Sequence, residues 1–400
     1  MNDDDVRGAG GTDVIIDMDT HFEPGRAWLA DYPTLAEKLP TYSVADATVR
    51  AQVGDLLALV AEEQRPPYET LLPPGIRAIL GQENVAGYGF KGSAMHTPAD
   101  PVARLAWMDR VGIDATNVLC LEGAGYARYL ENRTVAREVI AACNTWLADQ
   151  VDGYADRLMP ATSIDLTDIE SAIAELTRMR GRGSRTFLIA PIPVPGVPPM
   201  HRYFEPLWSA AEDLGMVALV HVGAGCNAYD PAWANYDDGM VLRQLGATQS
   251  HQAVMLMMNG MVFGGVFDRH PKLTLVIAEF GVHWFAGTVE HMDARGPAIV
   301  ESQIYMGHYP YELTPAEFVQ RNIRITPLPR LHQTPLRTME RYPDCVIFSS
   351  DYAHNESNHE PTAHYDALLA DLPADAKRRF MGGNIAECYS RMGDPLVARR

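Results

Sequence analysis

The chain alternates short runs of apolar, often β-branched residues with longer segments in which apolar residues recur at helical spacing. Short apolar runs bounded by Gly, Pro or Asp are typical of strands buried in a parallel sheet, and amphipathic segments are typical of the helices that cover it. The pattern predicts eight strands, at residues 13–18, 115–120, 157–164, 185–190, 216–222, 273–279, 323–326 and 344–351.

Helices are predicted between these strands, most clearly at residues 133–151, 168–180, 204–215 and 314–320. Several begin near a Ser, Thr or Asp that can cap a helix N-terminus, and Gly215 can end the third. Eight βα repeats favour a (β/α)8 barrel, or TIM barrel, over an open doubly wound sheet. No G-x-G-x-x-G follows the first strand, which argues against a dinucleotide site. We therefore expect one α/β barrel domain over residues 12–395.

Two stretches do not fit the repeat. Residues 25–100, which include "RPPYETLLPPG", separate the first two strands by far more than an ordinary βα loop. Residues 223–263 form a second irregular stretch directly after the fifth strand. Loops that follow barrel strands surround the C-terminal mouth, where specificity is built. We expect residues 25–100 to be an insertion over this mouth, and the polar residues 1–11 to be a disordered tail.

Charge and composition narrow the class of partner. The chain has 33 Lys and Arg against 51 Asp and Glu, a net charge of -18, which disfavours nucleic acid and anionic membranes. It has no long apolar run that could span a membrane and no signal-peptide pattern at its start. Its 5 cysteines show no C-x-x-C spacing, so we expect reduced, structural thiols. These features predict a cytoplasmic protein that acts on a small molecule.

The first predicted strand ends in a group of ionisable residues, in "IIDMDTHFEP". Alternate strand residues point to one face, so Asp17, Asp19 and His21 point the same way, with the last two at the mouth. A carboxylate and an imidazole there form half of a mixed divalent-metal site. Alternatively, Asp19 caps a turn and His21 is a hydrogen-bonded core histidine. We expect Asp17 to support the strand, and Glu23 either to orient a ligand or to replace Asp19.

Two further strands end in residues that can bind a metal. His221 ends the fifth apolar run and Asp351 ends the eighth. Catalytic groups of barrels lie at such ends, whereas a buried core position there would normally be apolar. The alternatives are a hydrogen-bonded core histidine for His221 and a helix N-cap for Asp351. The predicted metal site therefore consists of Asp19, His21, His221 and Asp351.

Five segments give the chain a family resemblance: "IIDMDTHFEP", "LVHVGAG", "GGVFDRHPKLTLVIAEFGVHW", "IFSSDYAHNE" and "GGNIAECY". It resembles the amidohydrolase-related superfamily over residues 13–390, in the branch of aminocarboxymuconate semialdehyde decarboxylase and the resorcylate-type decarboxylases. The resemblance implies a distorted (β/α)8 barrel with one divalent metal ion, most often zinc, with manganese as the alternative. It assigns the ligands to Asp19 and His21 on the first strand, His221 on the fifth and Asp351 on the eighth.

The chain departs from this family pattern at two positions. Asp19 stands where many relatives have the first histidine of H-x-H, and Glu279 stands where decarboxylases often have the strand-six histidine that transfers a proton. Glu279, His283 and His354 are the candidates to replace it. Each has a structural alternative: Glu279 can pair with an Arg or a backbone N–H, and the histidines can bond a loop or orient Asp351.

The same ligands support two reactions. A metal can activate water for hydrolysis, with Asp351 taking the proton, or it can bind a substrate carboxylate and a neighbouring oxygen during loss of carbon dioxide. The resemblance favours a carboxy-lyase that acts on a small unsaturated or aromatic acid. The alternatives are hydrolysis of a C–N or C–O bond, a hydratase or cyclase, and a binding barrel without catalysis.

Two further expectations concern binding. An anionic substrate needs a cationic receiver, and Arg128 in "GYARYLE" is the better candidate because Arg185 lies at the wrong end of its strand. The family resemblance and the aromatic loops at 87–90 and 305–313 suggest a homodimer or larger homo-oligomer.

Overall fold

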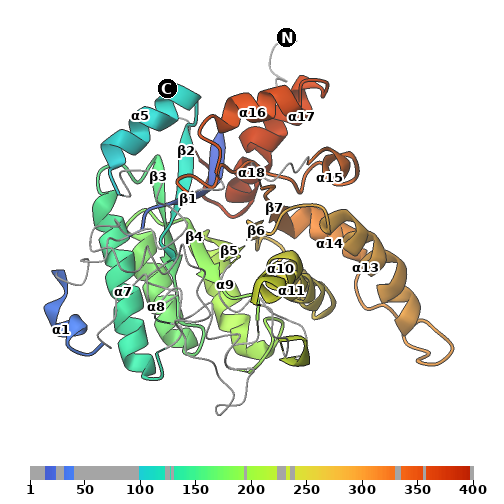
Figure 1. Cartoon of the computed structure of the whole chain (residues 1–400). Helices are drawn as coiled ribbons and strands as arrows, with labels where there is room; N and C mark the ends of the chain where they lie inside the picture. Colours follow the sequence, from blue (N-terminus) through green and yellow to red (C-terminus); the bar gives the residue numbers. More distant parts are fainter. Residues whose placement is uncertain are drawn as a thin grey trace, which may run out of the picture.

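The fold is built on one parallel sheet of seven strands, in which each strand lies beside the next one in sequence (Figure 1). The computed structural model describes residues 14–23, 31–39, 99–121, 127, 130–192, 196–222, 231–234, 239–328, 335–354 and 357–396. The strands are β1 (Ile16–His21), β2 (Ala115–Leu119), β3 (Leu158–Ser163), β4 (Thr186–Ile189), β5 (Val217–His221), β6 (Leu275–Ala278) and β7 (Ile323–Ile325).

The predicted eighth strand, residues 344–351, is not a strand, but its segment still joins the two edges of the curled sheet. Single parallel bridges connect Val346 to Ile325 of β7, and Tyr352 to Thr20 of β1. Between them, the Ser350 N–H donates to the Asp17 side chain and the Phe348 N–H to the Phe380 carbonyl oxygen, so neither N–H continues the ladder. The expected distorted barrel is therefore seven parallel strands with one irregular segment between the first and the last.

The other seven strands confirm the sequence prediction within a few residues, and β1 departs most. It continues to His21 instead of ending at residue 18, and all of its residues are buried. His21 still pairs with Leu119 of β2, after a register shift between Asp17 and Thr20. The ionisable residues thus belong to the strand itself.

The four predicted helices are confirmed as α7 (Arg133–Gln150), α8 (Ile169–Arg180), α9 (Glu205–Leu214) and α14 (Pro315–Asn322). Thr314 and Glu317 form a capping box at the start of α14, and Gly215 ends α9 with a φ of 66°. The other α-helices of the described ranges are α1 (Pro33–Ala36), α5 (Pro101–Val111), α10 (Gly239–Gln249), α11 (His251–Phe263), α12 (Val266–Arg269), α13 (Phe285–Val300), α15 (Leu336–Arg341), α16 (Pro361–Leu368), α17 (Ala374–Arg378) and α18 (Asn384–Arg391). Short 3-10 turns lie at Arg202–Phe204 and Pro231–Ala234, and a π-helical turn lies at Arg379–Gly383.

Apolar side chains pack on both faces of the sheet. On β5, Val217 and Leu219 point to the inner face, where they pack with residues of α18. His221 continues the same alternation and therefore points inward at the C-terminal end. At the other end, a Cβ at Gly382 would lie 1.8 Å from the carbonyl oxygen of Val14, so only glycine allows this close approach. The barrel interior is thus apolar toward its N-terminal end and polar at its C-terminal end.

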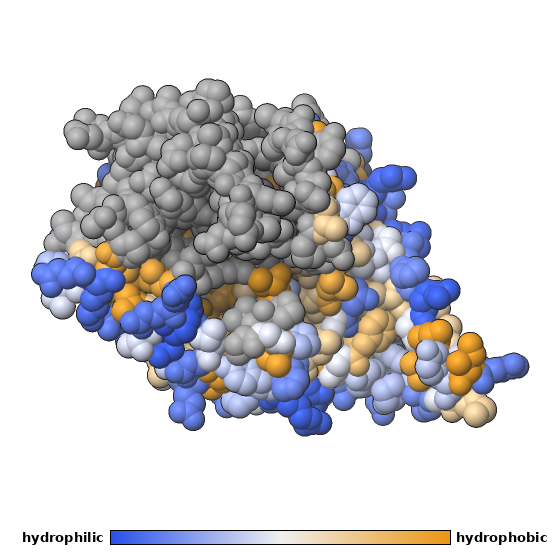
Figure 2. Space-filling model, turned by 60° about the horizontal axis from the view of Figure 1, so that its bottom comes forward, coloured by the Kyte–Doolittle hydropathy of each residue, from blue (hydrophilic) through white to orange (hydrophobic). Residues whose placement is uncertain are grey.

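An arm made of α13 and α14 extends from the barrel (Figure 1). Apolar residues gather at its end (Figure 2), where Ile304 and Met306 are 81% and 83% exposed. Within the described ranges, no helix combines the length and the apolar character that a membrane span requires. Of the predicted insertion, only residues 31–39 and 99–100 are described, and the predicted tail lies outside the described residues.

Candidate metal centre

A cluster of ionisable side chains lies at the C-terminal end of the sheet. Its members come from β1, β5, the end of β6 and the segment after β7, and each is at most 8% exposed. They are Asp19, His21, Glu23, His221, Glu279, Asp351 and His354.

The structure brings the four predicted metal ligands together. Oδ1 of Asp19 lies 3.2 Å from Nε2 of His21 and 3.4 Å from Nε2 of His221. Oδ1 of Asp351 also lies 3.2 Å from Nε2 of His21. Two imidazole nitrogens and two carboxylate oxygens thus point toward one small region.

This arrangement fits a divalent metal ion. Asp19, His21 and His221 form a group whose candidate ligand atoms all lie within 4.8 Å of one another, and His21, Asp351 and His354 form a second such group. Both carboxylate oxygens of Asp19 and Nε2 of both His21 and His221 are buried, and they make no hydrogen bond of good geometry with the described residues. Buried polar atoms without such bonds each cost about 1–3 kcal/mol, and a cation between them would remove that cost.

The electrostatics of the cluster also suit a cation. Burial acts to raise the pKa of Asp19, but the attraction of His221 and the contact with His21 outweigh it and lower the pKa. Burial acts to lower the pKa of His21, but contacts with Asp19, Asp351 and Glu23 raise it well above its ordinary value. The pKa of His221 is likewise raised, against burial, by Asp19 and Glu279. The raised pKa values of both rings reflect the surrounding carboxylates, whose negative charge a bound cation would also balance.

A hydrogen bond fixes the orientation of the His221 ring, and a carboxylate faces the His21 ring. Nδ1 of His221 lies 2.6 Å from the carbonyl oxygen of Val222, so this nitrogen donates and Nε2 is left for the centre. Nδ1 of His21 lies 3.6 Å from Oε1 of Glu23, which accepts a hydrogen bond of 3.0 Å from the Leu121 N–H. Of its two predicted roles, Glu23 therefore fits the orienting one.

Asp17 supports the strand, as predicted. Its Oδ1 accepts hydrogen bonds from the Asp19 N–H at 3.1 Å and from the Ser350 N–H at 3.0 Å. Burial raises the pKa of Asp17 to about 7, although the hydrogen bonds with Ser350 act to lower it. Asp17 thus joins β1 to the irregular segment that carries Asp351.

Two carboxylates of the cluster have an unusual backbone conformation. Glu279 has a φ of 60° and Asp351 a φ of 55°, in the left-handed region that non-glycine residues rarely adopt. Such a conformation costs on the order of 1 kcal/mol or more and persists only where the surrounding structure imposes it. Oε2 of Glu279 lies 3.1 Å from Nε2 of His221, and the backbone N–H of Glu279 donates to Thr326 Oγ1. The strained backbone therefore directs Glu279 into the cluster.

The structure brings two of the three proton-transfer candidates into the cluster. Nδ1 of His354 lies 2.7 Å from Oδ1 of Asp351, and its ring stacks on that of His21 at a centroid distance of 3.7 Å. Glu279 is the second. His283, by contrast, is exposed, and within the described part of the chain no ion pair joins it to the cluster. The prediction for His283 thus lacks the contact that the other two candidates have.

Two arginines were considered as receivers of a substrate anion, and the structure describes one of them. Arg128 lies outside the described residues. Arg185 precedes β4, at the N-terminal end of the sheet, and its Nη1 donates to the carbonyl oxygen of Asp394 at 3.1 Å. Its predicted position at the wrong end of the strand is therefore confirmed.

One buried charged residue that contacts the cluster is not marked by any sequence pattern. Arg104 of α5 is 3% exposed, and its Nη2 donates to the carbonyl oxygen of His21 at 2.7 Å. Its helix had clear start signals, because the Asp100 side chain accepts from the Ala103 N–H and Pro101 follows it. A single arginine in an amphipathic helix, however, usually points to solvent, and no pattern marked this one as buried.

Several solved structures share the fold. An amidohydrolase from Mycobacterium avium subsp. paratuberculosis K-10 is 21% identical with a TM-score of 0.66, and the match covers 94% of this chain and 99% of that one. For 5-carboxyvanillate decarboxylase from Sphingomonas paucimobilis the identity is 19%, the TM-score 0.61 and the coverage 95% and 99%. A dihydroxybenzoic acid decarboxylase from Polaromonas sp. JS666, with bound manganese and 2-nitroresorcinol, is 15% identical with a TM-score of 0.60. The match covers 95% of this chain and 97% of that one.

Sequence comparison identifies the family. No curated protein matches the chain. The family model described as amidohydrolase, however, matches residues 16–391, which include all seven strands and the whole cluster. The chain therefore belongs to the amidohydrolase family.

Proposed function

We propose that this protein is a metal-dependent carboxy-lyase that removes carbon dioxide from a small aromatic or unsaturated carboxylic acid. The observation that carries the proposal is the meeting of Asp19, His21, His221 and Asp351 at the C-terminal end of the sheet. The choice of reaction is supported by the aromatic-acid decarboxylases among the proteins of similar fold.

The proposed cofactor is one divalent ion held by these four residues. The imidazole ligands suit zinc, the metal that the family resemblance favours. The carboxylate ligands also suit manganese, which the Polaromonas decarboxylase contains. When bound, such an ion supplies a Lewis acid that binds a carboxylate and a neighbouring oxygen of the substrate.

The proposed reaction breaks the C–C bond to the carboxylate. Carbon dioxide leaves, the electron pair stays on the substrate carbon, and that carbon must then receive a proton. Asp351 and His354, whose facing atoms are 2.7 Å apart, form a pair that can hold this proton at the centre. In this scheme Asp351 both binds the metal and delivers the proton, and His354 replaces the proton from solvent.

Arg128 is the proposed receiver of the substrate anion. Arg128→Ala should raise KM for an anionic substrate at least about tenfold, the loss expected for one charge-assisted hydrogen bond. Arg185→Ala is the matched control, because Arg185 bonds Asp394 at the other end of the sheet. Equal KM values for the two variants would remove Arg128 from the substrate site.

Hydrolysis of a C–N or C–O bond is the second candidate, and Glu279 favours it. In place of Asp351, the base named above for hydrolysis, a carboxylate 3.1 Å from Nε2 of His221 can take a proton from an attacking water at the same centre. Glu279→Gln separates the two reactions because it keeps the shape of the side chain. It should abolish hydrolysis but leave decarboxylation through Asp351 and His354 largely intact.

The test is carbon dioxide release by the zinc- or manganese-loaded protein from a panel of ortho-hydroxy aromatic acids and unsaturated acids. A parallel panel contains amides, esters and lactones. The proposal expects metal-dependent release of carbon dioxide from at least one acid. Turnover of an amide, ester or lactone with no release of carbon dioxide from any acid would replace the carboxy-lyase with a hydrolase.

A further inference from the structure

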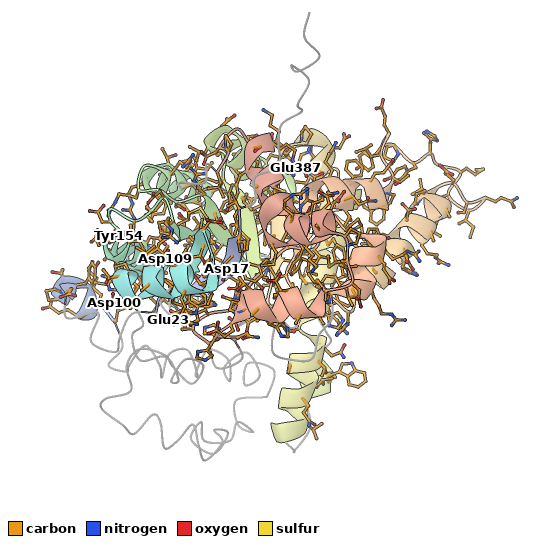
Figure 3. The ribbon with its side chains drawn as sticks, turned by 90° about the horizontal axis from the view of Figure 1, so that it is seen from above. Asp17, Glu23, Asp100, Asp109, Tyr154 and Glu387 are labelled. Atoms are coloured by element: carbon orange, nitrogen blue, oxygen red, sulfur yellow. The ribbon has the colours of Figure 1, made fainter. Side chains whose placement is uncertain are left out.

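Helix α5 lies against the end of β1 and the segment after Asp351. The Trp107 ring stacks on Tyr352 at a centroid distance of 3.8 Å and an angle of 16°, and its Nε1 donates to the carbonyl oxygen of His359 at 3.1 Å. The Thr362 hydroxyl donates to the Val111 carbonyl oxygen at 2.6 Å. In Figure 3, Asp109 is labelled on this helix. The helix thus contacts two of the three segments that supply ligands to the proposed metal.

Arg104 is the residue of α5 that connects these two segments. Its Nη2 donates to the carbonyl oxygen of His21 at 2.7 Å. Its guanidinium carbon lies 4.5 Å from the ring centroid of Phe22 and 4.6 Å from that of Tyr352. Phe22 directly follows His21, and Tyr352 directly follows Asp351. One buried guanidinium therefore contacts a ligand residue and the neighbours of two ligands.

We propose that Arg104 is a positioning residue that sets the spacing between His21 and Asp351, and thereby the affinity of the centre for a divalent cation. The inference rests on the proposed metal site. A planar guanidinium can donate in its plane while its faces contact aromatic rings, whereas the ammonium group of lysine has no such plane. The contacts of Arg104 therefore depend on its shape as well as on its charge.

Charge and position have opposite effects on metal affinity, which makes the role testable. A fixed positive charge near the centre repels a divalent cation, so removing the charge alone should tighten metal binding. Loss of positioning should instead weaken it, since residues that orient metal ligands typically change affinity by about 10–100-fold. The direction of the change distinguishes the two effects.

The experiment is a calorimetric titration of the metal-depleted, full-length protein with zinc and with manganese. Arg104→Met and Arg104→Lys should both bind the cation about 10–100-fold more weakly than the wild type, and lysine should not restore the affinity. The visible spectrum of the cobalt-loaded variants should also change, because the ligand geometry changes. Unchanged or tighter binding by Arg104→Met, or wild-type binding by Arg104→Lys, would overturn the role.

Arg324 provides a matched control. It is 1% exposed and donates to the carbonyl oxygens of Gln320 at 2.9 Å and Asn384 at 3.3 Å, away from the cluster. Arg324→Met should lower the unfolding temperature without changing metal affinity per folded molecule. An equal loss of affinity in the Arg104 and Arg324 variants would show general loosening of the fold and overturn the inference.

A second variant and the behaviour of the wild type decide the cases that Arg104→Met leaves open. If Arg104→Met does not fold, Phe22→Leu keeps the guanidinium but removes one of its aromatic neighbours. A several-fold loss of metal affinity in that variant supports the positioning role, and unchanged affinity overturns it. A wild type that binds neither cation overturns the proposed metal site and the role of Arg104 with it. Variants that match a metal-binding wild type overturn only the role of Arg104.

Discussion

Both ends of the sheet contain charged groups with little exposure, but the partners of these groups differ between the two ends. At the N-terminal end, Arg324 donates to backbone carbonyl oxygens, and Arg180 and Arg185 both contact Asp394. At the C-terminal end, Asp19 and His221 have buried atoms that face each other at 3.4 Å without a hydrogen bond of good geometry.

We interpret this difference as one between a stabilising end and the end that holds the proposed site. Charges that meet carbonyl oxygens or opposite charges are satisfied by the protein alone. Buried polar atoms reduce stability when the described protein groups do not form such bonds with them. We infer that a bound ion interacts with these atoms and removes that cost. Barrel enzymes have their active sites at this C-terminal end, whereas residues at the other end contribute to stability. The predictions that follow test whether the two ends can be altered independently.

The largest effect is expected for Asp351→Asn. Loss of both a ligand and the proposed proton carrier should reduce turnover by roughly 10³-fold or more, measured as kcat on the best substrate of the panel. Asp394→Asn is the matched change at the other end. It should reduce stability but leave kcat per folded molecule unchanged. A retained rate in Asp351→Asn would remove this carboxylate from the site.

The next largest effect is expected on removal of the metal. A ligand present at about 1,000 times its Kd stabilises a protein by about 4 kcal/mol, so chelation should lower the free energy of unfolding by about that amount. Urea denaturation with and without chelator measures the difference. The Asp351→Asn protein should respond much less, since it lacks a ligand. An equal response of the two proteins would mean that the ion binds elsewhere.

Gly382→Ala tests the N-terminal end alone. An added Cβ would lie 1.8 Å from the Val14 carbonyl oxygen, so the backbone must shift. Overpacking of this kind typically costs about 1–3 kcal/mol. The free energy of unfolding should fall by that amount, while metal affinity, measured by titration of the folded protein, should not change. A parallel loss of metal affinity would show that the two ends are coupled.

The smallest effect is expected for Glu23→Gln. The amide oxygen can still accept from the Leu121 N–H, but the negative charge opposite Nδ1 of His21 is lost. We expect a roughly tenfold loss of metal affinity, at the lower end of the range for groups that orient a ligand. Unchanged affinity would limit Glu23 to its backbone hydrogen bond.

Much of the fold could be predicted because its elements are locally encoded. Apolar runs marked seven strands, and caps such as Thr314 with Glu317 marked helix boundaries. The prediction of an eighth strand was wrong, and the interactions that replace its ladder are non-local. The Ser350 N–H, for example, donates to the side chain of Asp17, which is distant in sequence. The alternation of Asp17, Asp19 and His21 was predicted, but the boundary of β1 was placed at residue 18 because the apolar run ends there.

The sequence predicted the residues that meet in the cluster and the supporting position of Asp17, but not the contact made by Arg104. Strand-end positions were enough to identify His221 and Asp351. The support from Arg104 depends on a helix that packs against β1 across the structure, and a sequence pattern contains no such information. His283 was a reasonable candidate by spacing alone, but only the fold could show that it is exposed.

The most direct test of the central claim is metal stoichiometry, measured by elemental analysis of the purified wild type and of His221→Asn after incubation with zinc and manganese. Two groups of candidate ligands that share His21 predict one ion per chain in the wild type, and binding weakened by about tenfold or more when His221 is replaced. A folded wild type that retains neither metal, or a His221→Asn protein that retains as much as the wild type, would contradict the account.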